Sequence, residues 1–179
     1  MILLSLLLVV QQVGETPAAE PPVDWDAEFG SEKRVRDSVT GEFPVDPYEQ
    51  SNANAGAGPF GGDAMARAFG GQDGIRGIAE RTVTLSEADP RIAAIFAATD
   101  NVRLRRVLFE QFCYILNAGC DYSGRDMATA HRDLGTQSGD LNALVENLQT
   151  AMREANVPFA AQNRFLAKLA PMERDVVVR

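Results

Sequence analysis

The sequence predicts an all-α fold from residue 62 to the C-terminus, with about five to seven helices, some of them very short. Apolar residues in this region recur at spacings of three and four, which places them on one face of a helix. No segment alternates with the period of two that marks a half-buried strand. Glycine and proline stand between the periodic segments, where helices end and begin.

Two helices with a clear amphipathic pattern are predicted in the first half of this region, after a short turn over residues 63–68. The first ends near Ala88, because the residue before Pro90 disfavours helical backbone. The second is capped by Asp100 and stops at Gly119. The two apolar faces consist of Ile75, Ile78, Ala79, Thr82 and Val83, and of Leu104, Val107, Leu108, Phe112, Ile115 and Leu116.

Three further helices are predicted after residue 119. A short one over residues 127–134 ends at Gly135. Ser138 or Thr136 caps the next, and Pro158 begins the last. The apolar faces of the two long helices consist of Leu141, Leu144, Val145, Leu148 and Met152, and of Phe165, Leu166, Leu169 and Met172.

The first residues of the chain predict export. Residues 2–10 form a mostly apolar run that is far shorter than the ~20 residues of a spanning helix. Its length suits the apolar core of a signal peptide, and residues 16–18 offer small side chains before a cleavage point. We therefore expect a signal-like segment over residues 1–18, a periplasmic location and no stable membrane span. Because the usual positive charge is missing, an uncleaved tail or a misplaced start codon is the alternative.

Residues 19–61 predict a flexible acidic linker. They hold most of the prolines and lack apolar periodicity. Residues 20–61 contain nine acidic and three basic side chains, so most of the net charge of −8 belongs to this arm. The predicted domain over residues 62–179 is nearly neutral. An acidic chain repels phosphate, so a nucleic-acid partner is not expected.

His131 is the single histidine of the chain, which excludes metal centres built from several histidines. Met127 lies four residues before it and Leu134 three after, so His131 lies on an apolar helix stripe. No Gly-x-Ser-x-Gly motif supports a catalytic triad. A haem needs only one protein ligand on one face and apolar walls, which a helical domain with one histidine can supply. A core or half-exposed histidine without a ligand role is the structural alternative.

Cys113 and Cys120 are predicted not to pair. If both were helical, their Cα atoms would lie ~10 Å apart, too far for a disulfide. We expect Cys113 to be buried and Cys120 to be a free loop thiol that could link two chains in an oxidising compartment. A chain that folds back after Gly119 is the alternative.

Several motifs occur in order along residues 69–179. They are Phe69-Gly70-Gly71 followed by GIRGI, Ala88-Asp89-Pro90-Arg91-Ile92, Phe96, Thr99-Asp100, Tyr122-Ser123-Gly124-Arg125-Asp126-Met127, Ala130-His131, Gly135, Val157-Pro158 and the C-terminal LAPMERDVV. Together they resemble the truncated haemoglobins, specifically the group I (N-type) family, over 111 of 179 residues. The resemblance implies a truncated globin fold, a two-over-two helical sandwich, here preceded by the signal-like segment and a disordered acidic arm.

The same resemblance implies that the chain binds haem (iron protoporphyrin IX) and, reversibly, a diatomic gas such as O2, CO or NO. His131 would be the iron ligand. Tyr122 and the basic cluster of Arg103, Arg105 and Arg106 could meet the haem propionates, with a solvated basic face as the alternative. For the apolar members, plain core packing is the alternative. The haem-binding residues implied are His131, Phe96, Leu104, Leu108, Phe112, Tyr122, Met127, Thr82, Val83 and Leu148.

The distal side departs from the family pattern. Thr82, Val83 and Leu108 stand where relatives carry an aromatic-tyrosine pair and a glutamine, whose polar groups hydrogen-bond oxygen. Only Thr82 has a donor, so we expect fast O2 release. Dioxygenation of NO with an unidentified electron donor is possible by resemblance, but the missing donors argue against classing the chain as an enzyme. The alternative function is a haem-free globin-fold interaction module that uses the acidic arm.

Overall fold

A computed structural model of the chain describes residues 35–177, so the predicted segment 1–18 and residues 19–34 of the predicted arm lie outside the described residues. The described part contains eight α-helices, two 3-10 helices and no strand, which confirms the predicted all-α class. None of these helices has the length and apolar character needed to cross a membrane. The elements are η1 (Asn52–Ala55), α2 (Ala64–Ala68), α3 (Gly71–Ala88), α4 (Ala93–Ala97), α5 (Asn101–Ile115), α6 (Met127–His131), α7 (Ser138–Glu154), α8 (Phe159–Leu169), η2 (Ala170–Met172) and α9 (Glu173–Val176).

Helix ends follow the predicted signals with small differences. The last predicted helix is divided into α8, η2 and α9, because Pro171 lies within it and cannot donate a backbone hydrogen bond. Residues 35–177 therefore contain more helices than the five to seven expected. The start of α7 is capped by Gln137 and Asp140, whose side chains each accept from the other's backbone N–H, in place of the predicted caps Ser138 and Thr136.

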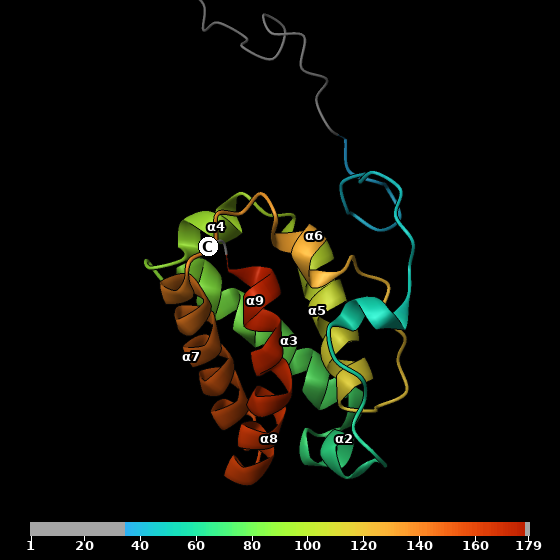
Figure 1. Cartoon of the computed structure of the whole chain (residues 1–179), viewed down its shortest axis with the longest axis vertical. Coiled ribbons are helices and arrows are strands. Elements are labelled where there is room, and N and C mark those ends of the chain that lie inside the picture. Colours follow the sequence, from blue (N-terminus) through green and yellow to red (C-terminus); the bar gives the residue numbers. More distant parts are fainter. Residues whose placement is uncertain (1–34, 178–179) are drawn as a thin grey trace, which may run out of the picture. The chain divides into compact units, whose positions relative to one another are not determined.

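The long helix α3 lies at the centre of the described domain and packs against α5 and α7 (Figure 1). Its predicted apolar face is buried from Ile75 to Val83. Phe165 of α8 completes the core, with its ring edge-on to Phe69 at 5.2 Å and to Phe112 at 5.0 Å. Burial of one such aromatic side chain stabilises the fold by ~2–3 kcal/mol.

The apolar faces of α5 and α7 are buried over only part of their length. On α5, Phe112 is buried, whereas Leu104 near the start of the helix is half-buried. On α7, Met152 is buried, whereas Leu141 near the start is half-buried. Both helix starts lie with α4 and α6 at the upper end of Figure 1. The bundle therefore has a closed core at one end and incompletely covered apolar side chains at the other.

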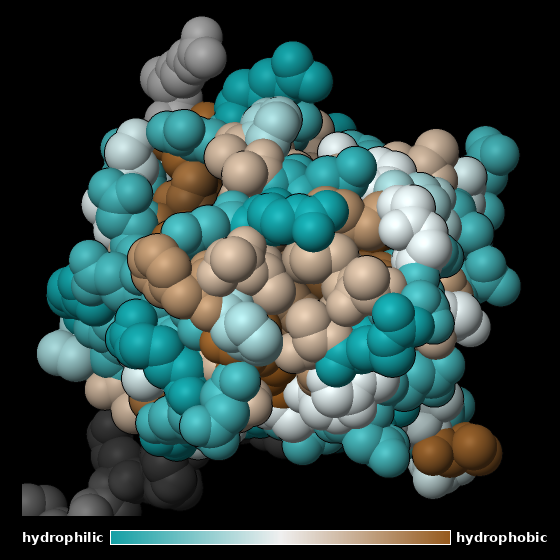
Figure 2. Space-filling view, turned by 90° about the horizontal axis from the view of Figure 1, so that it is seen from below, coloured by the Kyte–Doolittle hydropathy of each residue, from teal (hydrophilic) through white to brown (hydrophobic). Residues whose placement is uncertain are grey.

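The end of the bundle with the closed core, opposite to α4 and α6, is covered by its own side chains. Figure 2 views the end that carries α2 and the start of α8, and shows weakly hydrophobic residues in the middle with hydrophilic residues around them. The ring of Phe60 has the Arg164 guanidinium 5.6 Å and the Lys168 ammonium 5.2 Å from its centroid. The alkyl stems of such side chains shield apolar surface from water.

Residues 35–61 are not the flexible linker that composition predicts: they pack on the helices, and we call them the docked arm. The Phe43 N–H donates to the Asp100 carboxylate at 2.7 Å, and the Arg106 guanidinium donates to Glu42 at 2.5 and 3.0 Å. The compact unit therefore begins at Val35 rather than at residue 62. Composition misses the docking because single polar contacts between distant residues leave no periodic pattern.

The expectation of a free Cys120 is wrong, because Cys113 and Cys120 form a disulfide with their Cα atoms 5.6 Å apart. The larger expected distance assumed helix through both residues, whereas α5 ends at Ile115. Asn117 adopts a left-handed backbone with φ 58°, and the Ala118 N–H donates to the Cys113 carbonyl at 2.9 Å. This Schellman turn reverses the chain and brings Cys120 back to the last turn of α5.

We expect the oxidised protein to contain no free thiol and no disulfide-linked dimer, because both cysteines bond within one chain. Replacing both by serine is expected to lower the free energy of unfolding by ~2–3 kcal/mol, the closure entropy of so short a loop. Alkylation with mass spectrometry and urea unfolding measure the two effects. A dimer that disappears on reduction would contradict the pairing.

Two glycines of α3 are expected to respond oppositely to alanine. A Cβ at Gly74 would overlap the Phe69 carbonyl oxygen, whereas a Cβ at Gly77 would meet nothing within 4 Å. Gly74→Ala should therefore lower the free energy of unfolding by ~1–3 kcal/mol. Gly77→Ala should raise it by ~0.5–1 kcal/mol, because alanine favours helix. Urea unfolding measures both, and equal shifts would refute the close contact between Phe69 and α3.

Candidate functional site

His131 lies at the end of α6, and the helix itself orients its ring. Asp126 caps the helix by accepting from the Thr129 N–H at 2.9 Å. Nδ1 of His131 lies 2.8 Å from the Met127 carbonyl oxygen. A carbonyl can only accept, so Nδ1 carries the proton and Nε2 keeps the lone pair that binds metals. Within residues 35–177 no other group hydrogen-bonds this ring. Metal-ligating histidines are oriented by this kind of contact.

Three of the predicted site residues lie on helices at the incompletely covered end of the bundle. Phe96 lies on α4, and Leu104 and Leu108 lie one turn apart on α5. All three are half-buried, like His131. Covering such side chains is favourable by ~25 cal/mol for each Å² of apolar surface removed from water. This end of the domain therefore favours a bound apolar group.

The residues at this end fit a haem. Haem iron takes one protein ligand on its proximal face and apolar walls around it, and this end offers one imidazole, Phe96, Leu104 and Leu108. The described part of the chain has no group of three or more His, Cys, Asp or Glu side chains that could hold a metal ion. A donor set of one imidazole suits a metal whose other ligands come from a prosthetic group.

Thr82 and Val83 are buried in the second half of α3. The Thr82 hydroxyl donates to the Ile78 carbonyl at 2.8 Å, and the Ser86 hydroxyl donates to the Thr82 carbonyl at 2.8 Å. The one side-chain donor among the three departing distal positions is therefore used inside α3. Neither Val83 nor Leu108 can replace it, because their side chains carry no polar group.

Four predicted site residues lie in the buried core rather than at the half-covered surface. Phe112 packs edge-on against Phe165. The roles of these four predicted residues toward a bound group stay predictions. The four core residues are Phe112, Tyr122, Met127 and Leu148.

Tyr122 holds the loop between α5 and α6. Its hydroxyl donates to the Arg125 carbonyl at 3.0 Å, and burial raises the pKa of this hydroxyl well above its usual value. The phenol lies on Gly124, where a Cβ would overlap it. This contact explains why a glycine follows the tyrosine in the Tyr-Ser-Gly segment: the Tyr122 ring packs on Gly124, where a larger residue would not fit.

The arginines expected to meet propionates or solvent have carboxylate partners within the chain. Arg103 and Arg106 both pair with Glu42 of the docked arm, at 3.1 and 2.5 Å. The hydrogen bond from Arg106 lowers the pKa of Glu42 below its usual value. Arg105 pairs with Glu87 of α3 at 2.7 Å. These pairs make the cluster part of the protein's own packing.

Sequence reasoning missed Gln111, a buried residue on the inner face of α5. Its Nε2 donates to the Ala55 carbonyl at 2.9 Å and lies 3.3 Å from the Met127 sulfur. The signal was present, since Gln111 follows Leu108 by three positions and is a polar residue within an apolar stripe. Its partner in the docked arm has no such signal.

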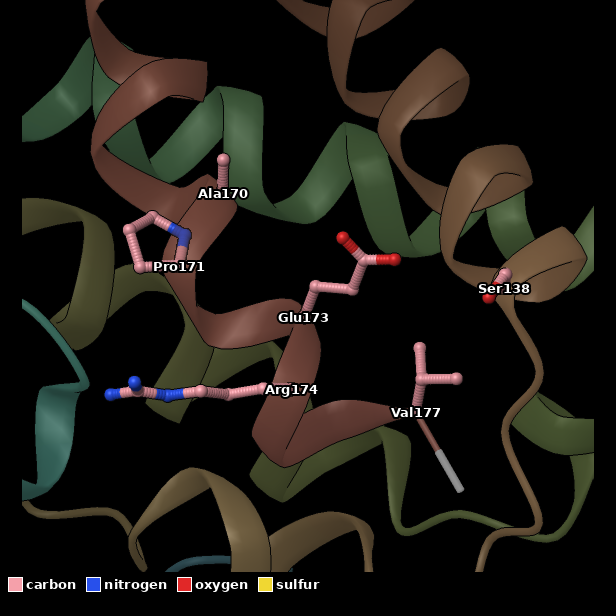
Figure 3. Close-up of a pocket in the computed structure, with 6 residues that line it drawn as sticks. All are labelled: Ser138, Ala170, Pro171, Glu173, Arg174 and Val177. Atoms are coloured by element: carbon pink, nitrogen blue, oxygen red, sulfur yellow. The ribbon is translucent and has the colours of Figure 1, made fainter. Parts of the chain in front are cut away.

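A hollow of about 320 Å³ lies between the start of α7 and the end of the chain's last helices (Figure 3). Glu173 and Arg174 point in different directions there, and Val177 points toward Ser138. None of the predicted site residues lines it. The candidate site therefore remains the half-covered end with His131. The lining residues are Ser138, Ala170, Pro171, Glu173, Arg174 and Val177.

Comparison with known proteins gives a family and a relative. The family described as bacterial-like globin matches residues 65–178. A group 1 truncated hemoglobin from Chlamydomonas moewusii is 29% identical over 91 residues, which are 50% of this chain and 53% of that protein. The chain thus spans about half the length of this relative.

Two solved structures share the fold. The truncated hemoglobin from Tetrahymena pyriformis, in the Fe(III) form, matches with a TM-score of 0.61 and 21% identity, over 64% of this chain and 98% of that one. The 2/2 hemoglobin from Synechococcus sp. PCC 7002, in the cyanomet state with covalently attached heme, matches with a TM-score of 0.60 and 23% identity, over the same shares. These matches confirm the predicted truncated globin fold.

The family match covers well over half of the chain, and the name of the relative supports group I. The chain belongs to the bacterial-like, or truncated, globin family.

Proposed function

We propose that this globin binds haem through His131 and, at the haem iron, reversibly binds a diatomic gas. The observation that carries the proposal is the contact between Nδ1 of His131 and the Met127 carbonyl, which leaves Nε2 as the metal-binding atom. The half-buried apolar side chains around the same end of the bundle support it. So do the neighbours of the same fold, one of which has covalently attached heme.

When bound, haem would supply an iron that can bind a diatomic gas. The chain's own residues do the rest. Met127 holds the imidazole in one tautomer and orientation through its carbonyl. Phe96, Leu104 and Leu108 offer apolar surface that would exclude water from the iron.

The predicted export also has structural support. Disulfides form and persist in oxidising compartments and are rare in the cytosol. The pairing of Cys113 with Cys120 fits a protein that leaves the cytosol, and we propose a periplasmic location.

Expression with haem supplied should give a protein with a Soret band, and His131→Ala should lose that band because the single imidazole ligand is removed. Added imidazole should restore it in the variant. Arg132→Ala, an exposed neighbour, is the matched control and should keep the band. Absorption spectra check all of this. A wild-type protein without a Soret band would favour the haem-free interaction module, and an unchanged spectrum in His131→Ala would refute the ligand assignment.

O2 release is expected to be fast, and Thr82→Val should leave it unchanged, because the Thr82 hydroxyl already donates to Ile78. Leu108→Gln would add a donor on the half-buried face of α5 and should slow release by ~10–100-fold, the effect of ~1–3 kcal/mol. Stopped-flow measurement on the ferrous protein gives these rates. Slow release by the wild type, or a large effect of Thr82→Val, would contradict the proposed apolar distal side.

A further inference from the structure

The docked arm contacts every residue of the loop over residues 121–125, which leads into α6. Asn52 makes two of these contacts: its Nδ2 donates to Asp121 at 2.8 Å, and its Oδ1 accepts from the Tyr122 N–H at 2.7 Å. The other three are Tyr48 hydroxyl to Ser123 carbonyl at 2.7 Å, Asn54 Nδ2 to Gly124 carbonyl at 3.2 Å, and Arg125 Nη2 to Asp46 carbonyl at 3.1 Å.

A charged cluster ties the same loop to α5. Arg106 of α5 donates to Glu42 of the arm, to Glu110 at 2.8 Å and to the Ser123 hydroxyl at 2.6 Å. Glu110 accepts in turn from the Ser123 hydroxyl at 2.6 Å and from the Ser123 N–H at 3.0 Å. Charge-assisted hydrogen bonds of this kind are roughly twice as strong as neutral ones. The loop is therefore fixed on one side by the arm and on the other by α5.

The loop leads through Asp126 to Met127, the first residue of α6, and Met127 contacts the same two elements, the docked arm and α5. Gly56 of the arm lies directly on it: a Cβ at Gly56 would be 3.1 Å from Met127 Cγ and 3.0 Å from the Met172 sulfur. From α5, Gln111 Nε2 lies 3.3 Å from the Met127 sulfur and donates to the carbonyl of Ala55. The carbonyl of the same Met127 orients the ring of His131.

We propose that residues 42–56 of the docked arm act as a template for the loop and for Met127, and thereby set the position of the His131 ring. Asn52, Tyr48 and Glu42 are then positioning residues for the iron ligand, although they lie outside the region that the family model matches. The inference rests on the proposed haem function. It assigns residues 42–56 a role in the site itself.

The test is Asn52→Ala, which removes both contacts to the start of the loop. Asn147→Ala is the matched control, because Asn147 also makes two side-chain hydrogen bonds, to Ser86 at 3.3 Å and Asp89 at 3.2 Å, away from the loop. Hydrogen exchange of the Tyr122 amide should speed up about tenfold in Asn52→Ala, the effect of one lost hydrogen bond. Haem transfer to excess apomyoglobin should speed up severalfold, and the iron–histidine band in the resonance Raman spectrum should shift.

The control should show none of these changes. Faster exchange at Tyr122 with an unchanged iron–histidine band and unchanged haem loss would overturn the inference, and so would equal changes in both variants. If the wild type takes up no haem, the proposed function fails, and exchange of the α6 amides in the haem-free chain decides the inference. Faster exchange in Asn52→Ala through α6 would then support it, and faster exchange at Tyr122 alone would overturn it.

Discussion

A helix of five residues cannot hold a side chain in place by itself. Nucleating a helical turn costs more than its first hydrogen bonds return, so α6 exists only because other parts of the chain fix it. Its start is held by the Asp126 cap and by the packing of Met127 under the docked arm and α5. The hydrogen bond from His131 to Met127 transmits that position to the imidazole. The position of His131 therefore depends on the tertiary contacts that Met127 makes with the docked arm and with α5.

The domain divides its apolar residues between two purposes. Around Phe165 they form a closed core that stabilises the bundle. At the starts of α5 and α7 the same helix faces continue, but the side chains are only half-buried. Periodicity is alike in both parts, because it records which face of a helix is apolar and not what covers it. A face of this kind left open at one end is consistent with a site for an apolar ligand.

The helices, their order and the position of His131 on a short helix follow from periodicity and capping signals, which act within a few residues. The family resemblance rests on equally local motifs. The docked arm, the disulfide and the use of the Thr82 hydroxyl do not follow from such signals. Glu42 meets Arg106 across 64 residues, and Cys120 reaches Cys113 through a left-handed turn at Asn117, a residue type not reserved for such turns. Gln111 stands out in the sequence as a polar residue in an apolar stripe, but nothing in the sequence indicates its partner, the Ala55 carbonyl.

The docked arm also bears on the order in which the protein assembles. Its hydrogen bonds to α5 and to the loop join residues that are 55 to 79 positions apart, from Phe60–Ile115 to Asp46–Arg125, whereas each helix is closed by hydrogen bonds between near neighbours. Closing a long stretch of chain costs conformational entropy before the new contacts stabilise the structure, so such contacts form late. The docked arm is synthesised before α5 and the loop over residues 121–125, so it cannot form these contacts until they have been made. The helix α6, which carries His131, is thus expected to be among the last parts of the domain to become ordered, after the core around Phe165 has formed.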